Sequence, residues 1–311
     1  MSKADINRAW DTFWERQQRK GPQSGGTGEG GCMPDSWNRI EHQRAQIWKD
    51  FARSLPKGAR TLDLGTGDGL VMAHMLQSRR DLKPLGIDRA TALPKPPRGA
   101  RMRGGVMMEE LPLPDGQFAV VTSQFGFEYG ETDRVASEIA RVLKPGGRAA
   151  LMTHRLDGPI VTHNRRRREQ IAWALEEQQL LKLARNSLGL RSAGIAALPR
   201  PIIEAPEKGA ALHGPNSAAW EIAEAIRRTL HLGRQDDPAQ VAAILDEIGQ
   251  QAQNELGRIE SLEAAAQAVS DGAALVKLMA DAGLACAEQR ELHDGASAAP
   301  FADFRIFRAA Q

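Results

Sequence analysis

The chain has 311 residues and a formal net charge of +2, so it offers ample core for one large domain with an insertion and no overall charge excess that would favour nucleic-acid binding. Its two cysteines, Cys32 and Cys286, lie far apart and form neither a metal-ligand pattern nor a disulfide framework. A secretory signal and an uninterrupted apolar stretch of membrane-spanning length are both missing from the sequence, which predicts a soluble, cytoplasmic protein.

The N-terminal segment 1–56 is predicted to form two helices joined by a flexible, glycine-rich loop at 21–31. Aromatic side chains at helical spacing mark the two helices: Trp10, Phe13, Trp14, Trp37, Trp48 and Phe51. These rings either pack the helices onto the rest of the protein or belong to a cover that closes over a bound cofactor, with the glycine-rich loop as its hinge. The sequence leaves both interpretations open.

A short apolar run at 61–64 ends in three glycines at alternate positions, Gly65, Gly67 and Gly69. Glycine permits positive φ and a close approach of the backbone to a ligand. The helix predicted over 70–77 begins at this turn, so its N-terminal N–H groups point toward the same place. A strand, a glycine turn and a helix in this order are typical of a cofactor-binding corner in an α/β sheet.

The spacing G-x-G-x-G differs from the G-x-G-x-x-G of dinucleotide-binding proteins, and the G-x-x-x-x-G-K-[ST] phosphate loop is absent from the sequence. A second short strand, 85–87, ends in Asp88, which lies roughly 20 residues beyond the glycine turn. A carboxylate there accepts hydrogen bonds from both ribose hydroxyls. The pattern therefore predicts a nucleoside-containing cofactor whose ribose is bound by Asp88.

Two more motifs follow in the chain. LPLPDGQF at 111–118 leads into a buried strand, the predicted fourth strand, and RVLKPGG at 141–147 leads into the predicted fifth strand, 149–153. Together with LDLGTGDG at 62–69 and Asp88, they resemble in order and spacing the class I S-adenosylmethionine-dependent methyltransferases, in particular the small-molecule branch. The resemblance implies a Rossmann-like, doubly wound α/β sheet of seven strands with an antiparallel last strand. It also implies S-adenosylmethionine as cofactor and S-adenosylhomocysteine as product.

In this family the methionine end of the cofactor would be held by Asp63 and the glycine turn, the ribose by Asp88, and the adenine beside Arg89. Met107 stands where the family often has an aspartate that bonds the adenine amine, and a thioether accepts such a bond poorly, so the backbone of Met108 is the alternative contact. The cofactor-binding residues that the resemblance implies are Asp63, Gly65, Thr66, Gly67, Gly69, Asp88, Arg89, Met107, Met108, Ser123 and Gln124.

The residues after the fourth strand, Phe127, Glu128 and Tyr129, stand where relatives bind the methyl acceptor. His154 ends the fifth strand, and His163 follows soon after. We interpret Glu128, Tyr129 and His154 as candidate catalytic groups, because an imidazole or a carboxylate can take a proton from an acceptor, and Phe127 as a candidate substrate contact. The alternative is a structural role for each, since methyl transfer from a sulfonium can proceed by alignment alone.

The stretch 155–270 is too long for a simple loop and shows apolar residues at helical spacing, except in the Pro- and Gly-rich segment 197–215, which is predicted to be irregular. We interpret it as a helical insertion that forms a substrate lid, or alternatively as a dimerisation or stabilising element. Arg165 and Arg168 can share a helix face and clamp a substrate carboxylate or phosphate. The alternatives are a solvated, salt-bridged surface and a nucleic-acid patch, the latter weakened by the lack of interleaved aromatics.

The predicted organisation is an N-terminal segment 1–56, a methyltransferase domain at 57–154 and 271–311, and the insertion at 155–270. The predicted function is methyl transfer from S-adenosylmethionine to a small organic acceptor, without a metal, in a chain that either stays single or forms a homodimer. Methylation of RNA or protein is the first alternative, although the N/D-P-P-Y signature of many such enzymes is absent after the fourth strand. A non-catalytic cofactor-binding or interaction module is the second.

Overall fold

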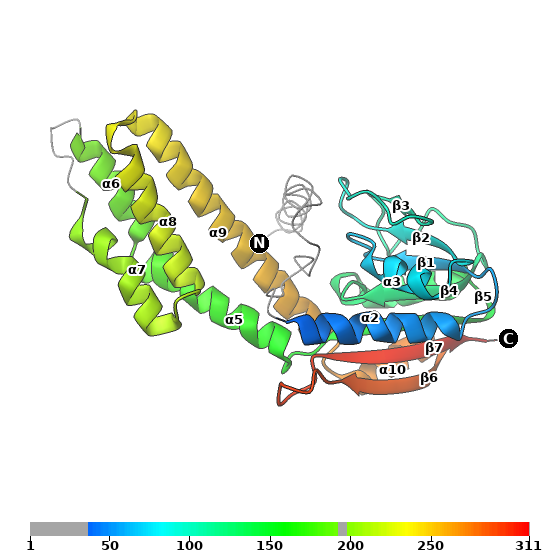
Figure 1. Ribbon diagram of the computed structural model, residues 1–311. Helices are drawn as coiled ribbons and strands as arrows, with labels where there is room; N and C mark the ends of the chain where they lie inside the picture. The colour runs from blue at the N-terminus through cyan, green and yellow to red at the C-terminus, as the bar shows by residue number, and fades with distance from the viewer. Residues whose placement is uncertain (1–36, 192–197, 311) are drawn as a thin grey trace. The chain divides into compact units, whose positions relative to one another are not determined.

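The computed structural model describes residues 37–191 and 198–310, and the chain divides into two compact units (Figure 1). The larger unit holds the chain up to Thr162 together with the residues from Glu260 onward. The smaller unit comprises His163–Ile259.

The second predicted N-terminal helix is present as α2 (Asn38–Arg53). Its buried face carries Ile40, Arg44, Ile47, Trp48, Phe51 and Ala52. The rings of Trp48 and Phe51 pack edge-on against Phe304 in the core, which is the packing role considered for this helix. The first predicted helix, with Trp10, Phe13 and Trp14, and the glycine-rich loop lie outside the described residues.

The larger unit is built on a seven-stranded sheet with the strand order β3-β2-β1-β4-β5-β7-β6. The strands are β1 (Arg60–Leu64), β2 (Lys83–Ile87), β3 (Arg101–Arg103), β4 (Phe118–Gln124), β5 (Leu143–His154), β6 (Leu284–Leu292) and β7 (Ala302–Ala309). The pairs among β1 to β5 are parallel, and β7 runs antiparallel to both β5 and β6. This topology confirms the predicted Rossmann-like sheet with an antiparallel last strand.

Helices cover both faces of this sheet, each with its own hydrophobic core. One core contains side chains of α2, of α3 (Leu70–Ser78) and of the last turns of α9 (Pro238–Ala268). The other contains side chains of α4 (Thr132–Val142) and α10 (Gly272–Asp281). The strand order reverses between β1 and β4, and in open α/β sheets the carboxyl ends of the strands at such a reversal form the ligand site.

The described residues of the smaller unit are almost entirely helical, as the apolar spacing predicted. Its elements are α5 (Pro159–Ala172), the π-helical turn η2 (Trp173–Glu177), α6 (Leu180–Arg191), α7 (Arg200–His213), α8 (Ala218–Leu232), the 3-10 turn η3 (Gly233–Gln235) and most of α9. They share a core of their own that includes Trp173, Ile226 and Leu245. The limits of the unit, 163 and 259, fall inside α5 and α9, whereas the sequence predicted an insertion from 155 to 270.

Helix α7 occupies much of the segment that the sequence predicted to be irregular, so that prediction is wrong. Pro201 lies in the first turn, where its missing N–H leaves no intrahelical bond unmade. Gly209 permits the close approach of α8, because a Cβ at this position would lie 3.1 Å from the carbonyl carbon of Ala219. The residues that suggested a loop therefore serve helix packing.

Candidate active site

The glycine turn follows β1 directly and leads into α3, as predicted. Gly65 and Gly69 have φ of 64° and 78°, in the left-handed region that favours glycine. A Cβ at Gly65 would lie 3.1 Å from the Cα of Gly126, and one at Gly69 would lie 2.8 Å from the Cδ of Pro97. The turn therefore needs glycine both for its backbone angles and for the space around it.

Asp88 lies at the end of β2 and is bonded to the glycine turn. Its Oδ2 accepts the N–H of Gly67 at 2.9 Å, and its Oδ1 accepts the N–H of Ala90 at 2.9 Å. These bonds place the carboxylate beside the turn, where the resemblance expects the ribose. A ribose contact at Asp88 stays a prediction.

Asp63 lies beneath the turn and braces it. Its side chain is buried, and its two oxygens accept the hydroxyls of Thr66 and Thr122, each at 2.7 Å. Burial raises the pKa of Asp63 to about 7, because a charged carboxylate loses its hydration there, while the two hydroxyl bonds act in the opposite direction. The side chains of Asp63 and Thr66 bond to each other. Their contacts with the cofactor remain predictions.

The end of β4 is fixed by side-chain bonds to neighbouring elements. Ser123 Oγ donates to the carbonyl of Leu64 and accepts the N–H of Phe127, both at 2.9 Å. Gln124 Oε1 accepts the indole N–H of Trp48 at 2.7 Å, which ties α2 to the site. Phe127 is fully buried in the hydrophobic core, and its role as a substrate contact stays a prediction.

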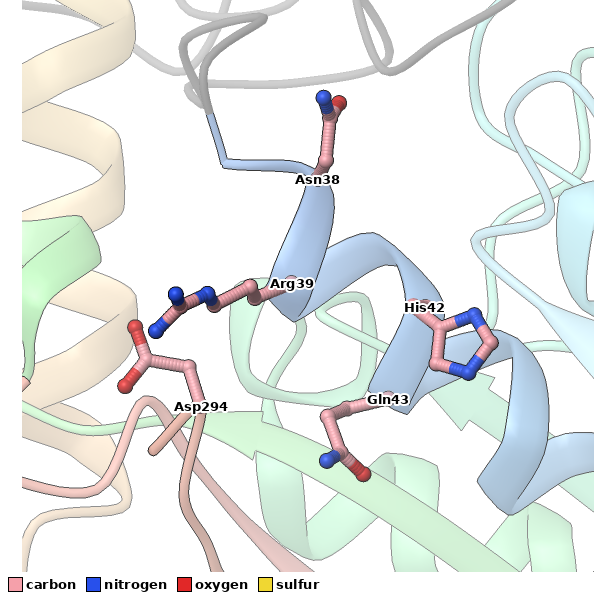
Figure 2. A pocket seen from close by; sticks show the side chains of 5 residues that line it. All are labelled: Asn38, Arg39, His42, Gln43 and Asp294. Carbon is pink, nitrogen blue, oxygen red and sulfur yellow. The ribbon is translucent and has the colours of Figure 1, made fainter. Parts of the chain in front are cut away.

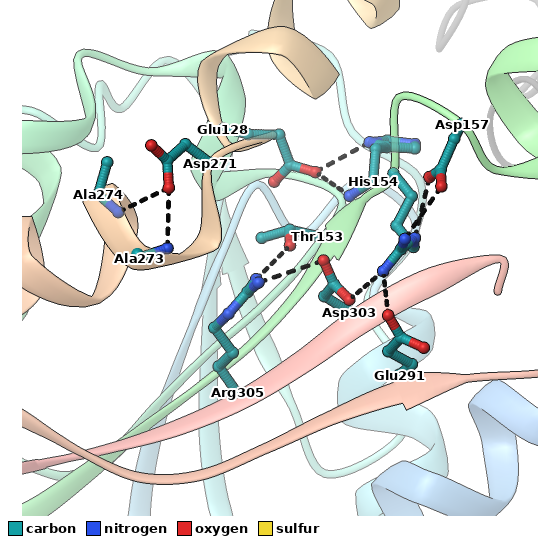
Figure 3. A network of polar contacts seen from close by, with 11 residues as sticks. Glu128, Thr153, His154, Asp157, Asp271, Ala273, Ala274, Glu291, Asp303 and Arg305 are labelled. Carbon is teal, nitrogen blue, oxygen red and sulfur yellow. Dashed lines mark hydrogen bonds and ion pairs between the residues drawn. The ribbon is translucent and has the colours of Figure 1, made fainter.

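Two of the three candidate catalytic residues form a buried pair at the carboxyl ends of β4 and β5 (Figure 3). Glu128 Oε1 lies 2.9 Å from His154 Nδ1 and also accepts the backbone N–H of His154 at 2.8 Å. A carboxylate only accepts hydrogen bonds, so Nδ1 is the donor. Within the described part of the chain, the buried Glu128 Oε2 has no hydrogen-bond partner. The pair thus holds the imidazole with its Nε2 left for another group.

Aromatic rings surround this imidazole. The Phe125 ring stacks on His154 with a centroid distance of 4.1 Å and an interplanar angle of 26°. The Tyr129 ring meets the same imidazole edge-on at 6.0 Å. Tyr129, the third candidate catalytic residue, therefore belongs to the same cluster. The ring stacked on His154 is that of Phe125, which directly follows β4.

The residues on either side of His154 anchor the end of β5 to the neighbouring strands (Figure 3). Arg155 binds Glu291 at 2.7 Å and Asp303 at 3.0 Å. Arg305 is buried on β7 and donates to Asp303 at 3.2 Å and to the hydroxyl of Thr153 at 3.3 Å. This network holds the end of β5 in place, and with it the backbone of His154 between Thr153 and Arg155.

Arg44 on α2 is a site residue that the sequence analysis missed. Only 3% of its surface is exposed, and its guanidinium carbon lies 5.9 Å from the centre of the Phe125 ring. Burial lowers its pKa to about 10, opposed by the charge of Asp68 in the glycine turn. It pairs with Glu41, and within the described residues its buried Nε has no partner. The available signal was an arginine spaced four residues from Ile40 and Trp48, on the apolar face of the helix.

The remaining predicted residues are placed as follows. Met107 is 41% exposed, whereas Met108 is buried in the core, and their adenine contacts stay predictions together with that of the half-buried Arg89. Arg165 and Arg168 lie on α5 and belong, with His163, to the smaller unit, so their substrate roles also stay predictions.

Arg167 supports the salt-bridged interpretation of the arginine run. Its Nε donates to Glu255 at 2.6 Å and its guanidinium binds Glu221 at 3.2 Å. Among the described residues, no three or more His, Cys, Asp or Glu side chains are grouped to hold a metal ion. Helices long and apolar enough to cross a membrane are likewise missing from the described ranges.

A shallow hollow lies on the exposed side of α2, lined by Asn38, Arg39, His42, Gln43 and Asp294 (Figure 2). Arg39 and Asp294 extend toward each other there, while His42 points away. The predicted site residues do not line this hollow. We therefore place the candidate active site at the glycine turn and the Glu128–His154 pair.

Comparison with known proteins shows a similarity that includes the glycine turn. Residues 62–151 match the family model described as a methyltransferase domain. The mitochondrial 2-methoxy-6-polyprenyl-1,4-benzoquinol methylase of Rattus norvegicus is 29% identical over 180 residues, which are 52% of this chain and 53% of the relative. The malonyl-[acyl-carrier protein] O-methyltransferase of Methylococcus capsulatus is 36% identical over 105 residues, 32% of this chain and 38% of the relative. The chain thus spans about half or less of the length of these relatives.

A chain from the complex between the Haloferax volcanii Trm112 methyltransferase activator and a methyltransferase matches at a TM-score of 0.46 and 14% identity, over 97% of this chain and 98% of its own length. The sheet topology and the glycine turn define a Rossmann-like cofactor-binding domain. Through residues 62–151 the chain is similar to methyltransferase domains, in agreement with the class I S-adenosylmethionine-dependent methyltransferases that the sequence motifs resemble.

Proposed function

We propose that this protein transfers the methyl group of S-adenosylmethionine to a small organic acceptor that must lose a proton, with His154 as the base. The observation that carries the proposal is the buried Glu128–His154 pair at the carboxyl ends of β4 and β5, beside the glycine turn. The two curated relatives are named for methylation of a benzoquinol and of a malonyl group on a carrier protein, which supports an acceptor group of small size.

The residues around the glycine turn suit this cofactor. The Asp88 carboxylate beside the turn is an acceptor that suits the hydroxyl groups of the ribose. Arg44 is a buried cation whose Nε lacks a partner in the described chain, so an anion such as the methionine carboxylate would complete its hydrogen bonding. We propose that Arg44 holds this carboxylate.

The bound cofactor supplies an electrophilic methyl group on a sulfonium. His154 would take the acceptor's proton at Nε2, because Nδ1 is committed to Glu128. The imidazolium that results is stabilised by the Glu128 carboxylate, which lies 2.9 Å from Nδ1. The acceptor keeps the electron pair of its broken bond to hydrogen and uses it to bind the methyl carbon, while the S–CH₃ pair returns to sulfur.

The test is label transfer from methyl-tritiated S-adenosylmethionine into a cell extract that is then separated into small molecules, RNA and protein. We expect label in the small-molecule fraction, a loss of on the order of a hundredfold in rate for His154→Gln, and a smaller loss for Glu128→Gln. Gly67→Arg, which fills the turn, serves as the control without cofactor binding. Label in RNA or protein would replace this proposal with the first alternative. Binding of S-adenosylhomocysteine without any transfer would favour the non-catalytic module.

A further inference from the structure

The backbone of Phe125, directly after β4, has a φ of 54°. Bulky L-residues avoid this region because the Cβ comes too close to the following carbonyl, whereas glycine adopts it freely. The next residue, Gly126, is a glycine, but its φ of −131° does not require one. A Cβ at Gly126 would lie 2.8 Å from Ser123 Oγ and 2.9 Å from the carbonyl of Leu64. The lack of room for a Cβ explains the glycine at 126, but local backbone geometry gives no reason for a phenylalanine at 125.

Burial of the Phe125 ring does not explain the residue either. The ring is only half-buried and packs at the margin of the core, while Phe127, two residues later, is fully buried. The distinctive contacts of Phe125 are the stack on His154, at 4.1 Å and 26°, and the guanidinium of Arg44 at 5.9 Å. Strained residues persist where the surrounding structure over-determines their conformation, and they cluster at active sites.

The imidazole of His154 is therefore held in two directions. Glu128 fixes its edge through Nδ1, and the Phe125 ring lies against its face. The Glu128 hydrogen bond alone would tolerate some rotation of the imidazole about its Cβ–Cγ bond, because hydrogen bonds accept a range of angles. A flat ring against the imidazole face removes this freedom, because the stacked arrangement is lost on rotation.

We propose that Phe125 is a positioning residue that fixes the plane of the His154 imidazole and thereby the direction of Nε2, and that its positive φ is retained for this purpose. This inference rests on the proposed role of His154 as the base. It goes beyond that role because it assigns the plane of the imidazole to Phe125, a residue that exchanges no proton. It also gives a reason for the backbone strain at the end of β4.

The test compares Phe125→Leu, Phe125→Gly and Phe125→Tyr in the full-length protein. We expect label transfer at saturating cofactor to fall on the order of tenfold to a hundredfold in the Leu and Gly variants, while the affinity for S-adenosylhomocysteine in calorimetry stays within about twofold. Phe125→Tyr keeps the ring and should retain transfer. Gln179 is the other non-glycine residue with positive φ in the described chain, at 49°, so Gln179→Gly controls for release of backbone strain as such.

Nuclear magnetic resonance of histidine-labelled protein supplies a second measurement that needs no acceptor. The Cε1–H signal of His154, assigned by its loss in His154→Gln, should move when the Leu or Gly variant removes the ring current, and should stay in Phe125→Tyr. An unmoved signal, or wild-type transfer despite a moved signal, would overturn the positioning role alone. A wild-type protein that transfers no label would overturn the proposed function and this inference with it.

Discussion

Replacement of the buried Arg44 by methionine should make the protein more stable and its cofactor binding weaker. Burial lowers the Arg44 pKa from 12.5 to about 10, so at pH 7, below both values, the folded protein carries the full cost of the desolvated charge. That shift corresponds to about 3 kcal/mol. The replacement also loses the pair with Glu41 and the contact with Phe125, each worth about 1 kcal/mol or less. The expected net gain in the free energy of unfolding is about 1–2 kcal/mol.

Cofactor binding should change in the opposite direction. A hydrogen bond to a charged group contributes about 1.5–3 kcal/mol, so Arg44→Met should weaken S-adenosylhomocysteine binding roughly tenfold to a hundredfold in calorimetry. Methylthioadenosine lacks the amino-acid end, and its affinity should be unchanged. Arg39→Met, on the exposed side of the same helix, is the matched control and should alter neither quantity. Undiminished binding of S-adenosylhomocysteine to Arg44→Met would refute the assignment of Arg44 to the carboxylate.

Three other perturbations test the site and the division into units. Burial raises the Asp63 pKa from 3.8 to about 7, so folding favours the protonated acid and the stability of the protein should fall as the pH rises between these values. Asp63→Asn should flatten that dependence in denaturation measured from pH 4 to 7. An unchanged slope would contradict the burial argument. Gly69→Ala should impair S-adenosylhomocysteine binding because its Cβ meets Pro97, whereas Gly116→Ala, at a φ of 58° with open space around it, should cost only about 1 kcal/mol of stability and leave binding intact; equal effects would exclude the steric explanation. Gly209→Val should lower the thermal stability of the helical unit through a clash with α8 and spare S-adenosylhomocysteine binding, and a loss of binding would show that the two units do not act independently.

The cofactor corner was predictable because its signals are local. A φ above zero at Gly65 and Gly69 selects glycine wherever the turn lies, and the acid at Asp88 follows from one strand–helix–strand step. The antiparallel last strand that the resemblance implies is found as β7, Ala302–Ala309. Glycine and proline are ambiguous in helices, however. In α7 they mark close packing and a helix start, and composition alone suggested a loop.

By itself, the sequence determined the class of fold, the position of the glycine turn and the residue types that could do chemistry, since each depends on neighbours in the chain. Tertiary structure decided which of them meet. Glu128 and His154 are 26 positions apart and become partners only when β4 and β5 pair, and Trp48 reaches Gln124 across 76 positions. It also placed the Phe125 ring against the imidazole of His154 and the Phe127 ring in the hydrophobic core. The sequence did not identify Arg44 as a site residue for the same reason. The desolvation cost of a buried charge and the groups it can bind depend on its surroundings in space, which the periodicity of the sequence does not show.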